Sequence, residues 1–451
     1  MTLSSLPVVI IGAGPVGLAA AAHLLARGVQ PLVLEADEQI AANVRRWSHV
    51  RVFSPWRYNI DAAAQTLLQA QGWTAPDDDH FPTGAELIAA YLEPLANVPA
   101  IADTLRLGAR VRTISRVRRD RMKDDARGET PFVVRYEQHG EEQDVLARAV
   151  IDASGTFETP NPIGAAGVPA IGERSARDQI WYGIPDVLGD QKTRYVGKRV
   201  LVVGSGHSAF NVLVDLAELS DGAASTPIQW AIRKASLASV AGGGENDQLE
   251  ERGALGLKVA ELVTAGRIVL HTGFQLDRLT QTPDGLTAWD GVAALPAVDE
   301  IIGATGFRPD LHMLDELRLS LDAGTQSPLA LGPLIDPNLH SCGTVRPHGA
   351  LELQHPEPDF YIVGMKSYGR APTFLMLTGY EQVRSVAAAI AGDHQAARRV
   401  ELVLPETGVC NTRPRRDEPG PGSAEGACSQ PAGVVASTQE GRGPKASSCC
   451  R

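Results

Sequence analysis

Three glycines near the start of the chain have the spacing of a phosphate-binding turn. Gly12, Gly14 and Gly17 follow the apolar run PVVII and precede the alanine-rich run LAAAAHLLARG, an order that predicts a strand, a tight turn and a helix. In such a turn the first glycine permits the bend, the second lets the backbone approach a pyrophosphate, and the third lets helix and strand pack closely. The helix N-terminus near Pro15 points free N–H groups at the phosphates. Gly12, Gly14, Pro15 and Gly17 are therefore predicted to bind a dinucleotide.

A carboxylate, Glu35, closes the next strand-like run, PLVLE. At that position a carboxylate accepts hydrogen bonds from the two hydroxyls of a ribose. It would also repel a 2′-phosphate, so the first turn is expected to bind FAD or NAD and not NADP.

The same order of elements recurs between residues 199 and 232, as RVLVV, GSGHSA, FNVLVDLAEL and IQWAI. Gly204 and Gly206, followed by Ala209, form the Gly/Ala variant of the turn. His207 and Ser208 lie between them and belong to the same predicted contact surface. A second dinucleotide site is expected here.

The second turn differs from the first at the ribose end, where Arg233 and Lys234 stand in place of an acid. A guanidinium binds a 2′-phosphate through charge-assisted hydrogen bonds, so this pair favours NADPH. The alternative is a solvent-exposed basic turn, which is the more frequent context of an Arg-Lys pair.

Two further segments, RAVIDASGT at 148–156 and VDEIIGATGFRPD at 298–310, each predict a strand that runs into small residues and glycine. They bracket the second glycine turn, which indicates that the second unit is inserted into the first. Between the two turns, PFVVRYEQHGEEQDVLARAV alternates like a β-hairpin. The segments 148–156 and 298–310 are the two crossings, where the chain is expected to leave the first domain and to return to it. Gly155, Thr305 and Gly306, which lie in them, are further cofactor candidates.

These patterns predict an α/β fold class. We expect an FAD-binding Rossmann-like domain of three layers (β/β/α) with an inserted NADPH-binding Rossmann-like domain. The expected parts are 1–160 and 297–405 for the FAD-binding domain, 161–296 for the insert, and 406–451 for a cysteine-containing tail.

Composition narrows the class of partner. The 451-residue chain carries a formal net charge of −11, which argues against nucleic acid or an anionic membrane surface as the main partner. The apolar opening lacks the basic region of a signal peptide, and no apolar run approaches the roughly 20 residues that span a bilayer. Five cysteines in the whole chain and no export signal favour a reducing cytoplasm.

Taken together, the motifs resemble the two-dinucleotide-binding flavoproteins, and among these the flavin-containing monooxygenases and their Baeyer-Villiger relatives. The resemblance covers roughly residues 6–400, and YVGKRVLVVGSGHSA (195–209) is similar to the stretch that leads those enzymes into their NADPH site. It implies that NADPH reduces FAD, and that a flavin C4a-hydroperoxide then oxidises a small-molecule substrate.

The chain also departs from the related families. The region before the second turn has neither the histidine nor the Phe-x-Gly pair of the monooxygenase signature, and no Cys-x-x-Cys of the disulphide reductases occurs anywhere. A NADPH-dependent reductase of a thiol, metalloid or quinone therefore stays open, as does a flavin-binding sensor without enzymatic activity. The stretches VRVFSPWRYNID, SCGTVRPHGA and GMKSYGRAPTF are similar to uncharacterised bacterial flavoproteins associated with arsenic-resistance gene clusters.

The resemblance suggests where the flavin contacts lie. In the resembling families, the segment matching 43–59 runs along the FAD pyrophosphate and the flavin, which makes Arg46, Trp47, Ser54 and Asn59 cofactor candidates. The two tryptophans of this segment are otherwise core residues.

The segment 360–392 predicts a strand to Gly364, a polar loop and a helix from about Thr373, whose N-terminus would face the flavin N1/O2 edge. Lys366 and Arg370 are candidates to add positive charge there, with solvated loop cations as the alternative. Lys366, Arg370 and Asn59 are the catalytic candidates.

Two histidines and the tail raise a question of metal binding. His348 and His355 lie near Cys342, but their spacing matches no familiar zinc pattern, so a loop on the substrate side of the flavin is favoured. The tail composition cannot form a core, which predicts disorder. The tail contains the thiols of Cys410, Cys428, Cys449 and Cys450. The tail is either an extension without a function, a site where these thiols bind a soft metalloid or thiol ligand, or an arm that takes electrons from the flavin.

Overall fold

The structure is a computed structural model that describes residues 2–222, 226–239, 250–339, 345–372 and 374–402. By internal contacts the chain divides into Met1–Thr412 and Arg413–Arg451, and the fold described here belongs to the first unit. Thr373 and the predicted thiol ligands Cys410, Cys428, Cys449 and Cys450 lie outside the described residues, as does Cys342.

The first glycine turn leaves a five-stranded parallel sheet with the order β15-β7-β1-β2-β3. The central strands β1 (Val8–Ile11) and β7 (Ala149–Asp152) are buried at every residue, as expected for a parallel sheet covered on both faces. The other strands are β2 (Pro31–Leu34), β3 (Leu105–Arg106) and β15 (Phe360–Ile362).

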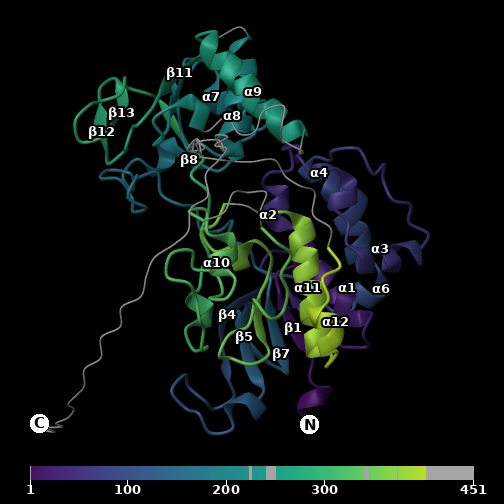
Figure 1. The fold of residues 1–451 in the computed structure, drawn as a ribbon. Helices are drawn as coiled ribbons and strands as arrows, with labels where there is room; N and C mark the ends of the chain where they lie inside the picture. The colour runs from purple at the N-terminus through teal and green to yellow at the C-terminus, as the bar shows by residue number, and fades with distance from the viewer. Residues whose placement is uncertain (1, 223–225, 240–249, 340–344, 373, 403–451) are drawn as a thin grey trace, which may run out of the picture. The chain divides into compact units, whose positions relative to one another are not determined.

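Alternate residues of these strands face two different layers. Val8 and Ile10 pack in the core formed with the helices α1 (Pro15–Leu25) and α11 (Met376–Ile390), which lie side by side (Figure 1). Val9 and Ile11 pack in a second core, against a three-stranded antiparallel sheet. That sheet consists of β4 (Ala109–Arg116), β5 (Phe132–Gln138) and β6 (Glu141–Ala147), and the last two form the predicted hairpin. The three-layer β/β/α prediction is confirmed.

Short helices complete the part of the chain around the first sheet. They are α2 (Ala42–Arg45), α3 (Ala62–Gln69), α4 (Gly84–Leu87), α5 (Glu93–Ala96), α6 (Pro99–Ala102), α10 (Gly332–Ile335) and α12 (His394–Arg398). None of the helices in the described ranges combines the length and the apolar composition needed to cross a bilayer.

A second five-stranded parallel sheet has the order β11-β10-β9-β14-β8. One face packs against α8 (His207–Ser220) and α9 (Glu250–Thr264), and the other packs against the hairpin of β12 (Arg278–Thr282) and β13 (Gly285–Trp289). The strands are β8 (Ile180–Tyr182), β9 (Val200–Val203), β10 (Ile228–Ala231), β11 (Ile268–His271) and β14 (Glu300–Gly303), and the short helix α7 (Lys192–Tyr195) precedes β9. The part of the chain around the second sheet is therefore a Rossmann-like insert, as predicted.

The predicted return to the first domain at residue 297 is too early. β14 pairs in parallel with β9, so residues 300–303 belong to the second sheet. The chain crosses back after Gly303, where Phe307 forms an antiparallel bridge with Pro160 on the outgoing segment. The two crossings thus run side by side in opposite directions.

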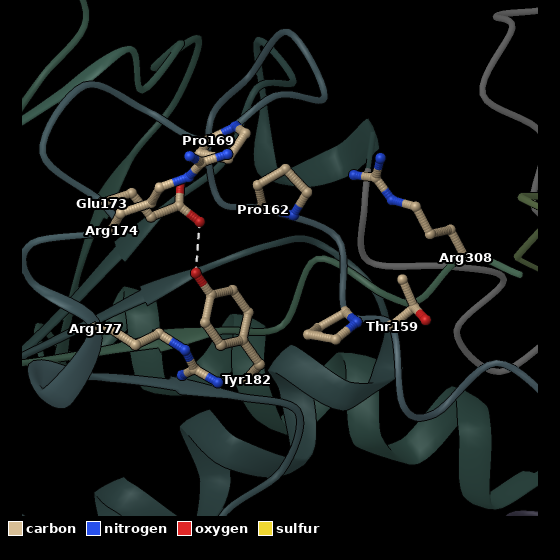
Figure 2. Close-up of a pocket in the computed structure, with 9 residues that line it drawn as sticks. Thr159, Pro162, Pro169, Glu173, Arg174, Arg177, Tyr182 and Arg308 are labelled. Carbon is tan, nitrogen blue, oxygen red and sulfur yellow. Dashed lines mark hydrogen bonds between the residues drawn. The ribbon is translucent and has the colours of Figure 1, made fainter. Parts of the chain in front are cut away.

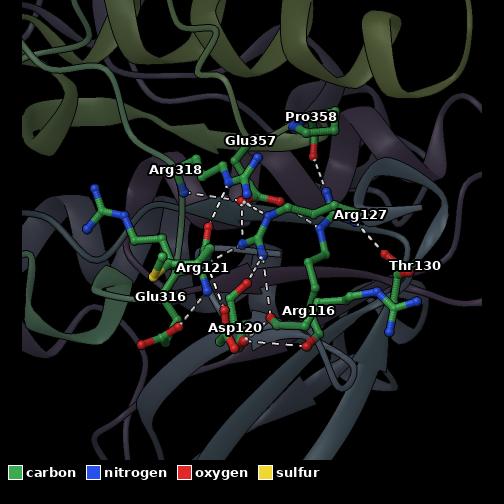
Figure 3. A network of polar contacts seen from close by, with 12 residues as sticks. Arg116, Asp120, Arg121, Arg127, Thr130, Glu316, Arg318, Glu357 and Pro358 are labelled. Carbon is green, nitrogen blue, oxygen red and sulfur yellow. Dashed lines mark hydrogen bonds and ion pairs between the residues drawn. The ribbon is translucent and has the colours of Figure 1, made fainter. Parts of the chain in front are cut away.

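A buried cluster of charges joins the three-stranded sheet to the segment before β15. Arg116 and Arg127 both bind the carboxylate of Glu357, at 2.8 Å in each case, and all three side chains are at most 5% exposed. Figure 3 shows this network, in which the backbone carbonyls of Thr130 and Pro358 also accept hydrogen bonds from Arg116. Burial would raise the pKa of Glu357, but the hydrogen bonds from the two guanidinium groups outweigh burial and hold its pKa below the ordinary value.

We predict that Glu357→Gln lowers the free energy of unfolding at pH 7 by about 3 to 5 kcal/mol, because it leaves two buried guanidinium groups without their anion. Because the folded pKa is depressed, the stabilisation is complete above the ordinary glutamate pKa and is lost as the pH falls through the folded value. Urea unfolding of both proteins between pH 3 and pH 7 measures this.

The matched control is Glu137→Gln, which breaks the Arg112–Glu137 pair, whose side chains are 50% and 40% exposed. That change is expected to cost at most about 1 kcal/mol. Equal losses for the two variants would contradict the structural role of Glu357.

Candidate functional site

The candidate site begins where β1 ends and the chain turns into α1. Gly12 has a φ of +97°, and its N–H donates to the carbonyl of Leu34 on β2. Gly14 is the N-cap of α1, and Pro15 is its first residue. The helix N-terminus therefore stands directly at the carboxyl edge of the first sheet, the geometry that binds phosphate in such folds.

Two glycines of this turn have different spatial requirements. A Cβ on Gly17 would lie 1.9 Å from the carbonyl oxygen of Gly12, which only glycine avoids. A Cβ on Gly14 would meet no atom within 4 Å. Gly17 thus serves the packing of helix on strand, and Gly14 leaves open space in front of the helix N-terminus. Both features fit a bound dinucleotide.

Glu35 follows β2 and turns back toward the glycine turn. One carboxylate oxygen accepts a hydrogen bond from the N–H of Ala13 at 2.7 Å, and the other accepts from the N–H of Asp37 at 3.0 Å. Burial raises the pKa of Glu35, although these backbone hydrogen bonds act in the opposite direction. The carboxylate is thereby fixed beside the turn, at the position predicted for a ribose ligand.

A buried ion pair lies at the same edge of the sheet. Asp152 is the last residue of β7, and its carboxylate lies 2.7 Å from the ammonium group of Lys366, which follows β15. Lys366 also donates to Ser154, whose hydroxyl donates to Asp152 at 2.6 Å. Lys366 is 2% exposed, so the alternative of a solvated loop cation is wrong for it. Its charge is balanced by Asp152, a partner that sequence reasoning missed.

A second polar cluster holds the backbone at Gly364, which has a φ of +66°. The N–H of Gly364 donates to Gln382 on α11 at 2.7 Å, and the side-chain amide of Gln382 donates to Ser367 and to Nε2 of His348. Because Nε2 accepts, Nδ1 carries the proton and faces the carbonyl of Arg346 at 3.2 Å. Burial lowers the pKa of His348, which keeps the ring neutral.

The segment 43–59 is partly core and partly surface. Ser54 and Asn59 are buried and bind each other, and the carbonyl of Asn59 accepts from Tyr380 on α11. Arg46 is half exposed and forms an ion pair with Glu158 at 2.8 Å. Trp47 packs closely on Gly84. The side chain of Asn59 bonds within the turn, to Ser54 and the carbonyl of Pro55, so its catalytic role stays a prediction.

Arg370 is exposed, and its guanidinium donates to the side chain of Gln326 at 2.6 Å. The helix predicted to start near residue 373 is α11, which begins at Met376 with Leu375 as its N-cap. Gly379 on this helix lies against Val16 and Gly364, which places the start of α11 beside the start of α1.

The second glycine turn repeats the first at the carboxyl edge of the second sheet. Gly204 has a φ of +137°, and a Cβ there would lie 2.2 Å from the carbonyl oxygen of Ala304. Gly206 is the N-cap of α8 and has open space around its Cα, whereas Ala209 is buried. Ser208, on the first turn of α8, is half-buried.

His207, the first residue of α8, links this turn to the segment 43–59. Its ring lies 5.6 Å from the ring of Phe53 and 5.8 Å from that of Phe210. Arg233 and Lys234 follow β10, as predicted. Arg233 is exposed and donates to the carbonyl of Ala165 at 3.2 Å.

Thr305 and Gly306 hold the two crossings together. The hydroxyl of Thr305 donates to the carbonyl of Asn161, and the carbonyl of Gly306 accepts from the Asn161 N–H at 2.9 Å. Gly155, with a φ of +72°, lies in the outgoing segment. Their contacts with the chain are structural, and the predicted cofactor contacts of all three stay predictions.

The two histidines have separate hydrogen-bond partners among the described residues. Nδ1 of His355 accepts from the N–H of Ser320 at 3.3 Å, whereas His348 binds Gln382. Within the described ranges, no three His, Cys, Asp or Glu residues come together as metal ligands.

Comparison with known proteins places this geometry in a family. The pyridine nucleotide-disulphide oxidoreductase family matches residues 9–330. The chain is 30% identical over 212 residues to the indole-3-pyruvate monooxygenase YUCCA1 of Oryza sativa subsp. japonica. The aligned region covers 46% of this chain and 44% of that protein. The chain thus matches less than half of the length of this relative.

Two solved structures share the fold. The bacillithiol disulfide reductase Bdr from Bacillus cereus superposes with a TM-score of 0.64 at 19% identity, covering 86% of this chain and 99% of that one. A flavin monooxygenase from Stenotrophomonas maltophilia gives a TM-score of 0.55 at 21% identity, covering 86% and 98%. The fold therefore occurs in both reductases and monooxygenases.

We predict that the two glycines of the first turn separate stability from cofactor binding. Gly17→Ala is expected to lower the stability of the FAD-free protein by about 1 to 3 kcal/mol or more, because its methyl group overlaps the Gly12 carbonyl. Gly14→Ala is expected to leave that stability within about 0.5 kcal/mol but to weaken FAD binding about tenfold or more.

Thermal unfolding of the FAD-free proteins and FAD titration by fluorescence measure the two effects. If Gly14→Ala binds FAD as tightly as the unchanged protein, the first turn is not the pyrophosphate site.

Proposed function

This chain belongs to the pyridine nucleotide-disulphide oxidoreductase family, and we propose that it is an NADPH-dependent flavin monooxygenase acting on a small molecule. The observation that carries the proposal is the pair of glycine turns on two parallel sheets, with Glu35 after the one and Arg233 and Lys234 after the other. An acid at the first ribose end and cations at the second suit FAD and NADPH respectively.

The residues at the first sheet edge fit FAD. Gly14 leaves room for a pyrophosphate in front of α1, and Glu35 is fixed where a ribose would lie. Lys366 and Asp152 form a neutral pair at the same edge, and Gln382 holds the Gly364 loop in one conformation. When bound, FAD supplies the capacity to take a hydride from NADPH and to react with oxygen.

The overall reaction then consumes NADPH, a proton and oxygen. One oxygen atom enters the substrate and the other leaves as water, with NADP+ as the oxidised product. The family and the relative named as a monooxygenase support an oxidoreductase of this kind. The sequence contains no Cys-x-x-Cys, which disfavours the disulphide-reductase alternative.

A reductase of a thiol, metalloid or quinone remains the second candidate function, and the adjacent Cys449 and Cys450 are the sequence feature that favours it. The arsenic connection, the thiol or metalloid ligand at the tail and the cytoplasmic location stay predictions.

The experiment that tests the proposal follows NADPH oxidation in air and without oxygen. With indole-3-pyruvate and other small molecules as trial substrates, we expect oxygen-dependent turnover and incorporation of 18O from 18O2 into the product. Turnover that persists without oxygen when a disulphide or arsenite is supplied would overturn the monooxygenase proposal in favour of the reductase.

We predict that replacing both Arg233 and Lys234 with Gln raises the KM for NADPH about tenfold or more while changing the KM for NADH less than twofold. The physical reason is that only NADPH carries the 2′-phosphate that these cations would bind. Steady-state oxidation of the two cofactors by both proteins measures this.

Arg112→Gln is the control, because Arg112 pairs with Glu137 on the three-stranded sheet. An equal rise in KM for both cofactors would contradict a phosphate contact at Arg233 and Lys234.

A further inference from the structure

A groove of about 370 Å³ lies beside the second sheet, on the face opposite α8. Figure 2 shows three arginines around it, Arg174, Arg177 and Arg308, together with the ring of Tyr182 and the proline Pro162. Neither the glycine turns nor their ribose-end residues line this groove.

The arginines of the groove differ from others in this acidic chain. Arg194 and Arg199, for example, lie 2.7 Å and 2.6 Å from carboxylates. Arg177 instead donates to the carbonyl of Ile180, and Arg308 donates to the Asn161 side chain and the Gly167 carbonyl. Arg174 lines the groove with no ion pair among the described residues. Three guanidinium groups thus surround one cavity without a carboxylate partner in the described part of the chain.

Glu173 is the one acid among the lining residues, and its carboxylate is already hydrogen-bonded. Glu173 is 3% exposed, and its carboxylate accepts hydrogen bonds from the N–H groups of Ile163 and Ala170 and from the hydroxyl of Tyr182. Burial, followed by this hydrogen bond to Glu173, raises the pKa of Tyr182, so the phenol stays neutral. Tyr182 therefore offers the groove a neutral ring, with the Arg177 guanidinium 4.8 Å from its centre. Glu173 forms no ion pair with the three arginines in the described part of the chain, and a single carboxylate cannot balance three guanidinium groups.

A fourth cation faces the groove residue Arg308. Burial lowers the pKa of Arg308, and the positive charge of Arg370 lowers it further. Arg370 donates to the neutral side chain of Gln326, so this repulsion is not offset by an acid at that contact. An anion bound near Arg308 would relieve it.

The groove and the predicted 2′-phosphate site have different residues. Arg233 and Lys234 follow β10, whereas Tyr182 ends β8, and the strand order puts β9 and β14 between them. Three strand spacings of about 4.8 Å place the two ends roughly 14 Å apart. The side chains approach more closely than the strand ends, because Arg233 donates to the carbonyl of Ala165 and Arg308 donates to that of Gly167 on the same loop. The NADP+ competition described below therefore decides whether one anion contacts both sets of cations.

We propose that this groove binds the carboxylate or phosphate of a small organic anion, with Arg174, Arg177 and Arg308 as its cationic contacts. Tyr182 and the prolines form a rigid wall for the apolar body of the ligand. This site stands independently of the monooxygenase reaction proposed above, since it rests on other residues.

The test is calorimetric titration of the full-length, FAD-loaded protein with benzoate, phenyl phosphate and benzyl alcohol. These probes share an aromatic ring and differ in the charged group. We expect at least one of the two anions to bind at least tenfold more tightly than the neutral alcohol, with an affinity that falls as salt is raised. The preferred anion distinguishes a carboxylate site from a phosphate site. Equal binding of all three probes, or no binding of either anion, would overturn the proposal.

Substitutions then locate the site. Arg174→Gln, whose guanidinium has no described hydrogen bond, is expected to weaken anion binding about threefold, and the triple change at Arg174, Arg177 and Arg308 about thirtyfold. Arg112→Gln is the matched control and should change nothing. Unchanged anion binding in both Arg174→Gln and the triple variant would exclude the groove.

Saturating NADP+ distinguishes a separate site from a part of the NADPH site. We expect NADP+ to leave anion binding within twofold, and Arg174→Gln to leave the NADP+ affinity unchanged. Displacement of the anion by NADP+, with a loss of NADP+ affinity in Arg174→Gln, would overturn the proposal by assigning the groove to the dinucleotide.

Discussion

The buried ion pair of Lys366 and Asp152 lies where three parallel strands end, and the arrangement of the first site depends on it. Asp152 ends β7, Lys366 follows β15, and the glycine turn after β1 packs on Ala153. Parallel strands finish at one edge, so this short ion pair joins the segments after β7 and β15 directly beside the turn after β1. Removing either partner would leave a buried charge without compensation.

The second parallel sheet also carries its glycine turn at the carboxyl edge, but the residues at that edge differ in charge. The strand after the turn's helix is followed by two cations, Arg233 and Lys234, where the first sheet has Glu35. The two crossings that join the units are short, antiparallel and held by Asn161 and Thr305. The chain thus presents an acidic and a basic nucleotide edge, which is the physical basis for assigning two different dinucleotides.

Sequence patterns predicted those features of the fold that depend on contacts between residues close together in the chain. The spacing of Gly12 and Gly17 is enforced by a backbone contact within one turn, so the sequence alone identifies it. The ion pair of Lys366 could not be predicted in this way, because its partner Asp152 lies on another strand and no pattern around residue 366 indicates that partner. The strand β14 was placed in the wrong domain for the same reason. By its sequence, an apolar strand followed by glycine fits either sheet equally well. The parallel pairing of β14 with β9 places it in the second sheet. The Arg174, Arg177 and Arg308 groove also combines segments that the sequence separates.

We propose that the domain of the first sheet holds FAD and that the inserted domain delivers the hydride of NADPH to it. Anaerobic mixing of the purified protein with one equivalent of NADPH tests this directly, by following the visible absorbance of the flavin. We expect that the protein purifies with about one FAD per chain and that one NADPH bleaches it fully. A protein that binds no FAD when it is supplied, or a bound flavin that NADPH leaves oxidised, would contradict this division of roles.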